Sequence, residues 1–96
     1  MMSAEQKKRV ITRLKRIEGQ IAGLRRMVES DTYCVDVLTQ VSAAQGALGK
    51  VGEIVLGKHI ETCVTEAFEH GSDDERRAAV EELMGVFSRY GRLGGR

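Results

Sequence analysis

The sequence predicts an all-α fold for three reasons. Apolar residues recur at helical spacing over long stretches, proline is absent, and β-branched residues do not alternate with polar ones over any length. A chain of 96 residues suits one domain, 1–96, built as a three-helix protomer. A protomer of this size buries a modest core and leaves apolar helix faces uncovered, so we expect it to form an oligomer.

The first helix is expected to begin near Ala4, because Ser3 and Gln6 have the spacing of a capping box. Its apolar residues alternate in steps of four and three, as one face of a helix requires. They are Val10, Leu14, Ile17, Ile21, Leu24 and Val28. Residues 30–32, Ser-Asp-Thr, are expected to end this helix and to supply a cap for the second.

The second helix is expected to run from Tyr33 to His70, with Gly71 as its C-cap. Steps of four and three from Cys34 define a mostly apolar stripe along it. The stripe comprises Cys34, Leu38, Val41, Gln45, Leu48, Gly52, Val55, His59 and Thr62. A second capping box, from Ser72 to Glu75, begins a third helix over about 73–90.

Cys34, His59 and Cys63 form a candidate metal site. His59 and Cys63 are four residues apart, so both side chains leave one face of the helix. Cys34 lies 25 residues before His59, which in a helix is roughly 38 Å. Ligands of one metal lie within about 4 Å of one another. A continuous helix therefore requires Cys34 to meet His59 and Cys63 of a second, antiparallel chain. The sequence predicts an antiparallel helical-bundle dimer with two identical sites.

A break in the second helix is the alternative. A hairpin bend at Gly49 or Gly52 would bring Cys34 near Cys63 within one chain, and each glycine costs a helix about 1 kcal/mol relative to alanine. However, this region contains no Pro, Asn or Asp, and the apolar stripe keeps its phase across it. Both features favour the continuous helix.

Two thiolates and one imidazole form a soft, three-coordinate set of ligands. Such a set suits Cu(I), whereas Zn(II) prefers a fourth ligand. Taken singly, a helical Cys is often a small core residue, and a His on an apolar stripe is often a core or interface residue. The metal hypothesis depends on one geometric assumption that brings all three residues together. We find no catalytic set and no phosphate-binding loop, so an enzyme is not expected.

The formal net charge of +1 is unevenly distributed along the chain. Residues 1–26 hold eight Lys or Arg against two Glu, whereas residues 27–96 hold seven against twelve Asp or Glu. Arg9, Arg13 and Arg16 lie off the apolar stripe and indicate an anionic partner, with a solvated face as the simpler alternative. Because no helix-turn-helix motif is evident, any contact with DNA would come from helix faces and go mainly to phosphates.

The sequence shows no long apolar run and no signal peptide, so we expect a cytoplasmic protein with no membrane segment. In that compartment two cysteines serve as ligands or redox groups more often than as a structural disulfide.

Three blocks of the sequence resemble the CsoR/RcnR family of metal-sensing transcriptional repressors, and the resemblance covers nearly the whole chain. They are Arg13-Leu-Lys-Arg-Ile-Glu-Gly-Gln20, Tyr33-Cys-Val-Asp-Val-Leu38, and His59 with Cys63. The resemblance implies a dimer that assembles as a dimer of dimers, with copper bound between protomers. It also implies an apo form that binds operator DNA and a Cu(I) form that releases it, so that copper-homeostasis genes are derepressed.

The positions of Cys34, His59 and Cys63 match the copper ligands of that family. Other branches of the family differ at these places. The nickel and cobalt branch adds an amino-terminal His, the formaldehyde branch uses an amino-terminal Pro and lacks the second thiol, and the persulfide branch lacks the histidine. The combination in this chain therefore resembles the copper branch.

The resemblance also implies roles for four other residues. Tyr33 and Glu82 match the pair that surrounds the ligands, Arg13 matches a DNA-contacting arginine, and Lys50 stands where relatives have a basic DNA-binding residue. Two other functions stay open. One is a persulfide- or thiol-redox-sensing repressor that uses Cys34 and Cys63, and the other is a helical metal-binding module that does not bind DNA.

Overall fold

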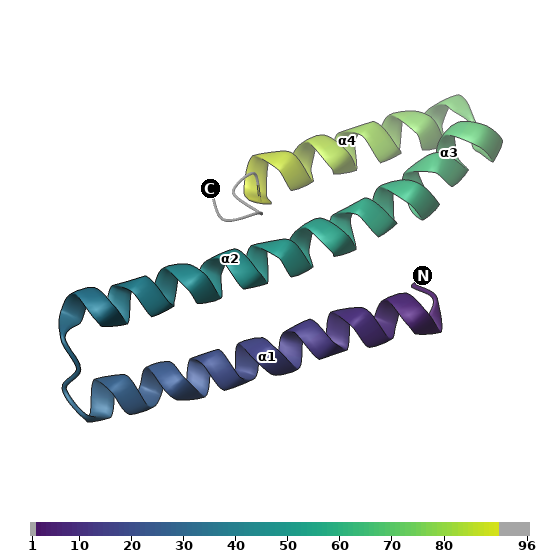
Figure 1. The fold of residues 1–96 in the computed structure, drawn as a ribbon. Coiled ribbons are helices and arrows are strands. Elements are labelled where there is room, and N and C mark those ends of the chain that lie inside the picture. Colours follow the sequence, from purple (N-terminus) through teal and green to yellow (C-terminus); the bar gives the residue numbers. More distant parts are fainter. Residues whose placement is uncertain (1, 91–96) are drawn as a thin grey trace.

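The computed structural model describes residues 2–90, and every regular element in that range is helical (Figure 1). In chain order these are α1 (Ala4–Glu29), α2 (Cys34–His59), the π-helical turn η1 (Ile60–Val64), α3 (Thr65–His70) and α4 (Asp73–Tyr90). No residue separates α2, η1 and α3, so residues 34–70 form one continuous rod. The predicted all-α, three-helix protomer is confirmed, and the alternative of a hairpin bend is wrong. None of these helices is both long and apolar enough to span a membrane.

Both predicted capping boxes are present. The Gln6 amide donates to the Ser3 hydroxyl at 3.1 Å, and the Ser3 amide donates to the Gln6 side-chain oxygen at 3.1 Å. Ser72 and Glu75 make the same reciprocal pair at 3.0 and 3.2 Å. Hydrogen bonds from Ser72, the one from its backbone foremost, lower the pKa of the Glu75 carboxyl. The starts of α1 and α4 are therefore fixed by residues three apart in the sequence.

The connection between α1 and α2 differs from the prediction at the start of α2. The N-cap residue is Tyr33, and no side chain caps this helix end. The prediction that residues 30–32 supply a cap is wrong, because these residues are engaged in the preceding turn. Their amides donate to carbonyls in the last turn of α1. Asp31 reverses the chain with a left-handed backbone, at φ 56°, a conformation that Asp tolerates better than most residues.

The end of α3 depends on close contact between two segments of backbone. Gly71 is the C-cap, as predicted, and its amide donates to the Ala67 carbonyl at 3.0 Å. The backbone of Gly71 is extended, at φ −86° and ψ 164°, so a left-handed conformation is not the reason for glycine here. Instead, a Cβ atom at this position would overlap the Ala67 carbonyl oxygen. Glycine is required because nothing larger fits against that oxygen.

The buried core lies between α1 and α2, which pack antiparallel, whereas α4 folds back onto η1 and α3 (Figure 1). Val10, Ile17 and Val51 form the core cluster, and the partly buried side chains around it are Met2, Ala47 and Ile54. Only part of the apolar stripe predicted for α1 is buried in this core. Leu14, Ile21 and Val28 are 37–62% exposed.

The stripe predicted to begin at Cys34 is not the face that packs on α1. That contact uses a neighbouring face of α2, which includes Ala44 and Val51. Leu38, Leu48 and Val55, which belong to the predicted stripe, are 41–64% exposed. The stripe that carries the two ends of the candidate metal site is therefore uncovered in the single protomer.

The protomer has an elongated shape that does not complete a core. Its Cα radius of gyration is 17.6 Å and its extents are 58 × 29 × 14 Å, whereas a compact domain of this length has a radius near 12–13 Å. Among the described residues, no large side chain is fully buried. Such exposed apolar faces mark surfaces that associate with another chain.

The steric role of Gly71 can be tested against Gly85, which lies inside α4 with open space where a Cβ would be. We expect Gly71→Ala to lower the free energy of unfolding by about 1–3 kcal/mol, because the added carbon overlaps the Ala67 carbonyl. Gly85→Ala should raise it by up to about 1 kcal/mol, since alanine is the better helix former. Urea denaturation followed by circular dichroism measures both. Equal effects of the two changes would contradict the steric explanation.

Candidate metal centre

His59 and Cys63 lie on either side of the junction between α2 and η1. His59 is the last residue of α2, and its side chain is 23% exposed. Cys63 is a free, exposed cysteine within η1. The Thr62 hydroxyl lies 3.6 Å from the Cys63 sulfur and donates mainly to the Lys58 carbonyl at 2.8 Å. The imidazole and the thiol are thus displayed together at one end of the long rod.

Glu82 reaches His59 from α4. Its Oε1 lies 2.8 Å from His59 Nε2, and the carboxylate remains largely exposed. A carboxylate accepts only, so the geometry fits donation from Nε2–H. That leaves Nδ1 as the ring nitrogen with a free lone pair. A carboxylate on the outer nitrogen is the usual partner of a metal-binding histidine, because it fixes the tautomer and the ring orientation.

Two contacts of Arg76 support the turn that brings α4 back to the rod. The Arg76 Nε donates to the Phe68 carbonyl at 3.2 Å, and its Nη1 lies 3.0 Å from Asp73 Oδ1. The first bond joins α4 to α3, and the second holds the side chain along its own helix. Glu82 is positioned by this packing, which no short sequence pattern indicates.

Cys34 and Tyr33 lie at the opposite end of α2. Cys34 is a free, exposed cysteine in the first turn, and Tyr33 is 69% exposed beside it. The 26 residues of α2 hold this end about 38 Å from His59. Within residues 2–90 of a single chain, no three His, Cys, Asp or Glu side chains come close enough together to hold a metal ion. One chain therefore joins His59 to Glu82 and carries Cys63 at the same end of the rod, whereas Cys34 and Tyr33 lie at the other end.

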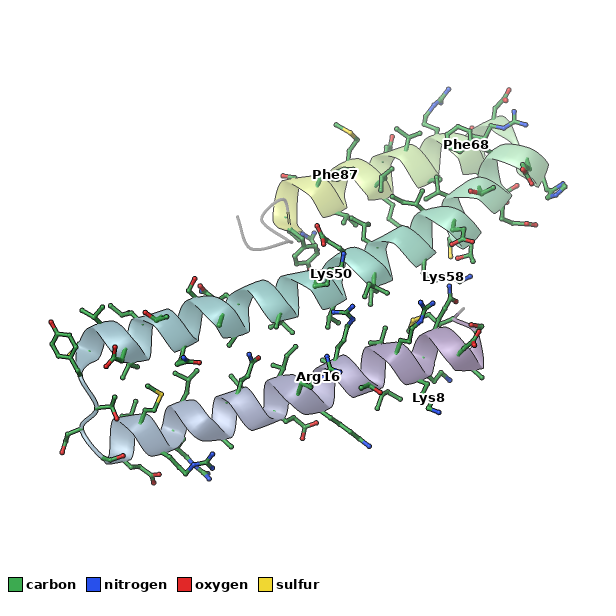
Figure 2. The ribbon with its side chains drawn as sticks, in the orientation of Figure 1. Lys8, Arg16, Lys50, Lys58, Phe68 and Phe87 are labelled. Carbon is green, nitrogen blue, oxygen red and sulfur yellow. The ribbon has the colours of Figure 1, made fainter. Side chains whose placement is uncertain are left out.

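The basic residues predicted on the first helix lie along one exposed face of α1. Arg9, Arg13 and Arg16 line a shallow groove together with Lys8. Figure 2 shows Lys50 on α2, away from this groove. Lys50 lies 3.7 Å from Glu53, and both side chains are more than half exposed, so this pair contributes little.

Lys58 is a basic residue that the sequence reasoning missed. It lines a second groove, between the start of α1 and the end of α2, with Arg9 and Arg13 on one side and Glu53 and Glu61 on the other. Figure 2 shows Lys58 beside the start of α1. Its neighbours in the sequence are mostly acidic or apolar. The antiparallel packing of α1 and α2 is the signal that could have placed Lys58 beside the basic helix.

The protomer is all-helical and has a basic helix face. It carries an imidazole and a thiol at one end of the rod and a second thiol at the other. These features define a class of protein, the helical metal-responsive DNA-binding regulators. The comparisons with known proteins agree with this class. A family model described as "Metal-sensitive transcriptional repressor" matches residues 6–89. The chain belongs to this family, which is the one that its sequence resembles. It is a family of transcriptional regulators rather than of enzymes.

Individual relatives carry more specific descriptions. A copper-sensing transcriptional repressor, CsoR of Bacillus subtilis, is 42% identical over 88 residues, which are 92% of this chain and 84% of that protein. The crystal structure of the copper-sensing repressor CsoR with Cu(I) from Geobacillus thermodenitrificans matches with a TM-score of 0.86 and 38% identity, over 95% of this chain and 92% of that one. The nickel-responsive regulator InrS matches with a TM-score of 0.73 and 35% identity, over 90% and 93%.

Cross-linking tests the separation of the two thiols. A thiol-specific linker shorter than about 10 Å cannot join Cys34 to Cys63 of one chain, because the rod formed by α2 and η1 holds them roughly 40 Å apart. We expect such a linker to produce covalent dimers on denaturing gels. Cys34→Ser and Cys63→Ser should each abolish the product, since equivalent thiols of an antiparallel pair lie at opposite ends. A monomer carrying an internal cross-link would contradict the straight-helix geometry.

Proposed function

We propose that this protein is a copper(I)-responsive transcriptional repressor. The observation that carries the proposal is the uninterrupted α2, which separates Cys34 from His59 and Cys63 and so requires a second chain to complete the ligand set. The apo protein binds operator DNA, and binding of Cu(I) at the site between chains releases it. The copper-sensing repressors among its relatives support this choice of metal.

The ligands would be Cys34 of one chain with His59 and Cys63 of a second copy, arranged as an antiparallel pair. Three donors, two of them thiolates, suit the soft and low-coordinate Cu(I). Two of the three are already displayed together in one chain, and all three are accessible or only partly buried. The pair of chains would place two such sites at its ends, and a dimer of dimers would carry four.

His59 is the ligand whose surroundings best fit a metal. Glu82 holds Nε2, which leaves Nδ1 as the donor. The carboxylate fixes the tautomer of the imidazole and sets its orientation. In the antiparallel pair, Tyr33 follows Cys34 to the same end, so the phenol would arrive near His59 and Glu82 of the other chain. A repressor that sensed persulfide through its two thiols would have no use for this imidazole and carboxylate pair.

The DNA-binding surface would be the basic face of α1, formed by Arg9, Arg13 and Arg16, with Lys50 and Lys58 contributed by α2. A pair of chains presents these cations twice, and a dimer of dimers four times. Since helix faces rather than an inserted recognition helix carry them, most contacts would go to phosphates. Release of DNA on metal binding requires a coupling free energy of about 1–3 kcal/mol or more between Cu(I) binding and DNA binding.

Subunit mixing tests whether the site is shared. Cys34→Ala and His59→Ala should each weaken Cu(I) binding strongly, as measured by competition with a colorimetric chelator. After the two variants are mixed and exchanged, mixed dimers contain one intact site, so about a quarter of the wild-type sites should return. His59→Ala mixed with Cys63→Ala is the matched control and should restore none. Equal recovery in both mixtures, or recovery in neither despite proven exchange, would contradict the shared site.

Salt dependence tests the basic face. The logarithm of the DNA association constant should fall steeply with the logarithm of salt concentration, because several phosphates are neutralised at once. Arg13→Gln should reduce that slope by about one for each phosphate that residue 13 no longer neutralises. Arg89→Gln, in the last turn of α4, makes the same charge change outside the face and should leave the slope unchanged. Fluorescence anisotropy with a duplex selected for binding to the apo protein measures both. A slope near zero for the wild type would rule out this surface.

A further inference from the structure

The rod that carries the metal ligands contains one irregular turn, and it lies between His59 and Cys63. In η1 the Thr65 amide donates to the Ile60 carbonyl, five residues back, and also to the Thr62 carbonyl, three back, whereas in an α-helix the acceptor is four back. Such π-turns are rare, usually occur singly within α-helices, and are frequent at functional sites. The position of this one cannot be read from the apolar periodicity, which continues through it.

The Thr65 side chain adds a second bond to the same carbonyl. Its hydroxyl donates to the Ile60 oxygen at 2.9 Å, again five residues back. The three other helical threonine hydroxyls that bond to backbone in the described range reach carbonyls four residues back, at 2.8–2.9 Å. They are those of Thr12, Thr39 and Thr62. The Thr65 hydroxyl thus bonds the carbonyl that the π-turn brings within reach.

The turn changes how His59 and Cys63 face one another. At 3.6 residues per turn, a residue four positions along lies about 40° past its partner around the helix axis. A turn closed by a bond to the fifth residue contains more residues, so each residue rotates less about the axis and Cys63 moves back from that offset toward the side of His59. Rotation in this sense favours a common direction for the imidazole and the thiol. Two ligands of one metal ion require such convergence, because the bonds are only about 2.0–2.3 Å long.

We propose that Thr65 is a positioning residue for the metal site: by bonding the Ile60 carbonyl it holds η1 in its π form, which aligns His59 with Cys63. This inference deepens the proposed copper site and rests on it. Thr65 is itself exposed and lies outside the ligand set. It acts through the backbone between the two ligands, and its neighbour Thr62 keeps the ordinary bond to Lys58.

The first measurement needs no variant. In deuterated, isotope-labelled apo protein, the scalar coupling across the hydrogen bond identifies which carbonyl accepts from the Thr65 amide. We expect the coupling to connect Thr65 to Ile60. Coupling to the Glu61 carbonyl would show an ordinary α-turn in solution and would overturn the proposal. This readout does not depend on whether copper is bound.

The second measurement compares the Cu(I) dissociation constants of variants by chelator competition. Thr65→Val keeps the shape of the side chain and removes its hydroxyl. We expect Cu(I) binding to weaken about tenfold, the lower end of the effect of losing a residue that orients a metal ligand. Thr65→Ser restores the hydroxyl and should bind within about twofold of the wild type. Thr12→Val removes an ordinary four-back bond on α1, a helix without ligands, and should likewise leave the affinity unchanged.

The spectroscopic signature separates positioning from a general loss of stability. If Thr65 aligns the pair, X-ray absorption of copper-loaded Thr65→Val should show a weaker nitrogen contribution, with helicity retained by circular dichroism. Unchanged affinity in Thr65→Val would overturn the proposal, and so would loss of helicity, which would assign Thr65 to the fold alone. If the wild type itself failed to bind Cu(I), the proposed function would fail, whereas the coupling between Thr65 and Ile60 would still stand.

Discussion

The rigidity of α2 is the constraint on which the rest of the molecule depends. A helix of 26 residues cannot bend its first turn back to its last, so Cys34 and His59 remain separated by most of the length of the protein. Because the ligands of a metal must converge within a few ångströms, the same rigidity makes one chain insufficient. For the proposed ligand set of Cys34, His59 and Cys63, metal binding would be a property of an assembly, and occupancy of the site would change how two chains are held.

The uncovered apolar faces have the same origin. A long rod packed on one side by α1, and by α4 only near its far end, keeps part of its apolar surface open. Leu38, Leu48 and Val55 lie on that open side, along the stripe that begins at Cys34 and reaches His59. A second rod laid antiparallel on this stripe would bury those side chains and join the ligands in one step. Stability of the assembly and completion of the site would thus come from one surface.

Most features that depend on nearby residues were predicted correctly from the sequence, apart from the cap expected at residues 30–32, and those that depend on packing were not. The capping boxes at Ser3 and Ser72 involve partners three residues away, so their patterns fix the helix starts. The stripe on α1 showed that a face is apolar but could not show that Val10 packs on α2 while Val28 stays open, since that choice belongs to the tertiary structure. The π-turn was missed because periodicity does not register one widened turn. Spacing led to the proposed ligands, which stay a prediction, whereas the contact between His59 and Glu82 depends on the fold of α4.

The position of Lys58 has a consequence for communication between the two ends of the proposed switch. Lys58 immediately precedes His59, and its side chain lies in the groove with Arg9 and Arg13. Allosteric coupling is usually pictured as a relay through many packed residues. Here a single peptide unit joins a proposed metal ligand to a cation beside the basic helix. A small rotation of the backbone at the end of α2 would therefore redirect positive charge without any intermediary.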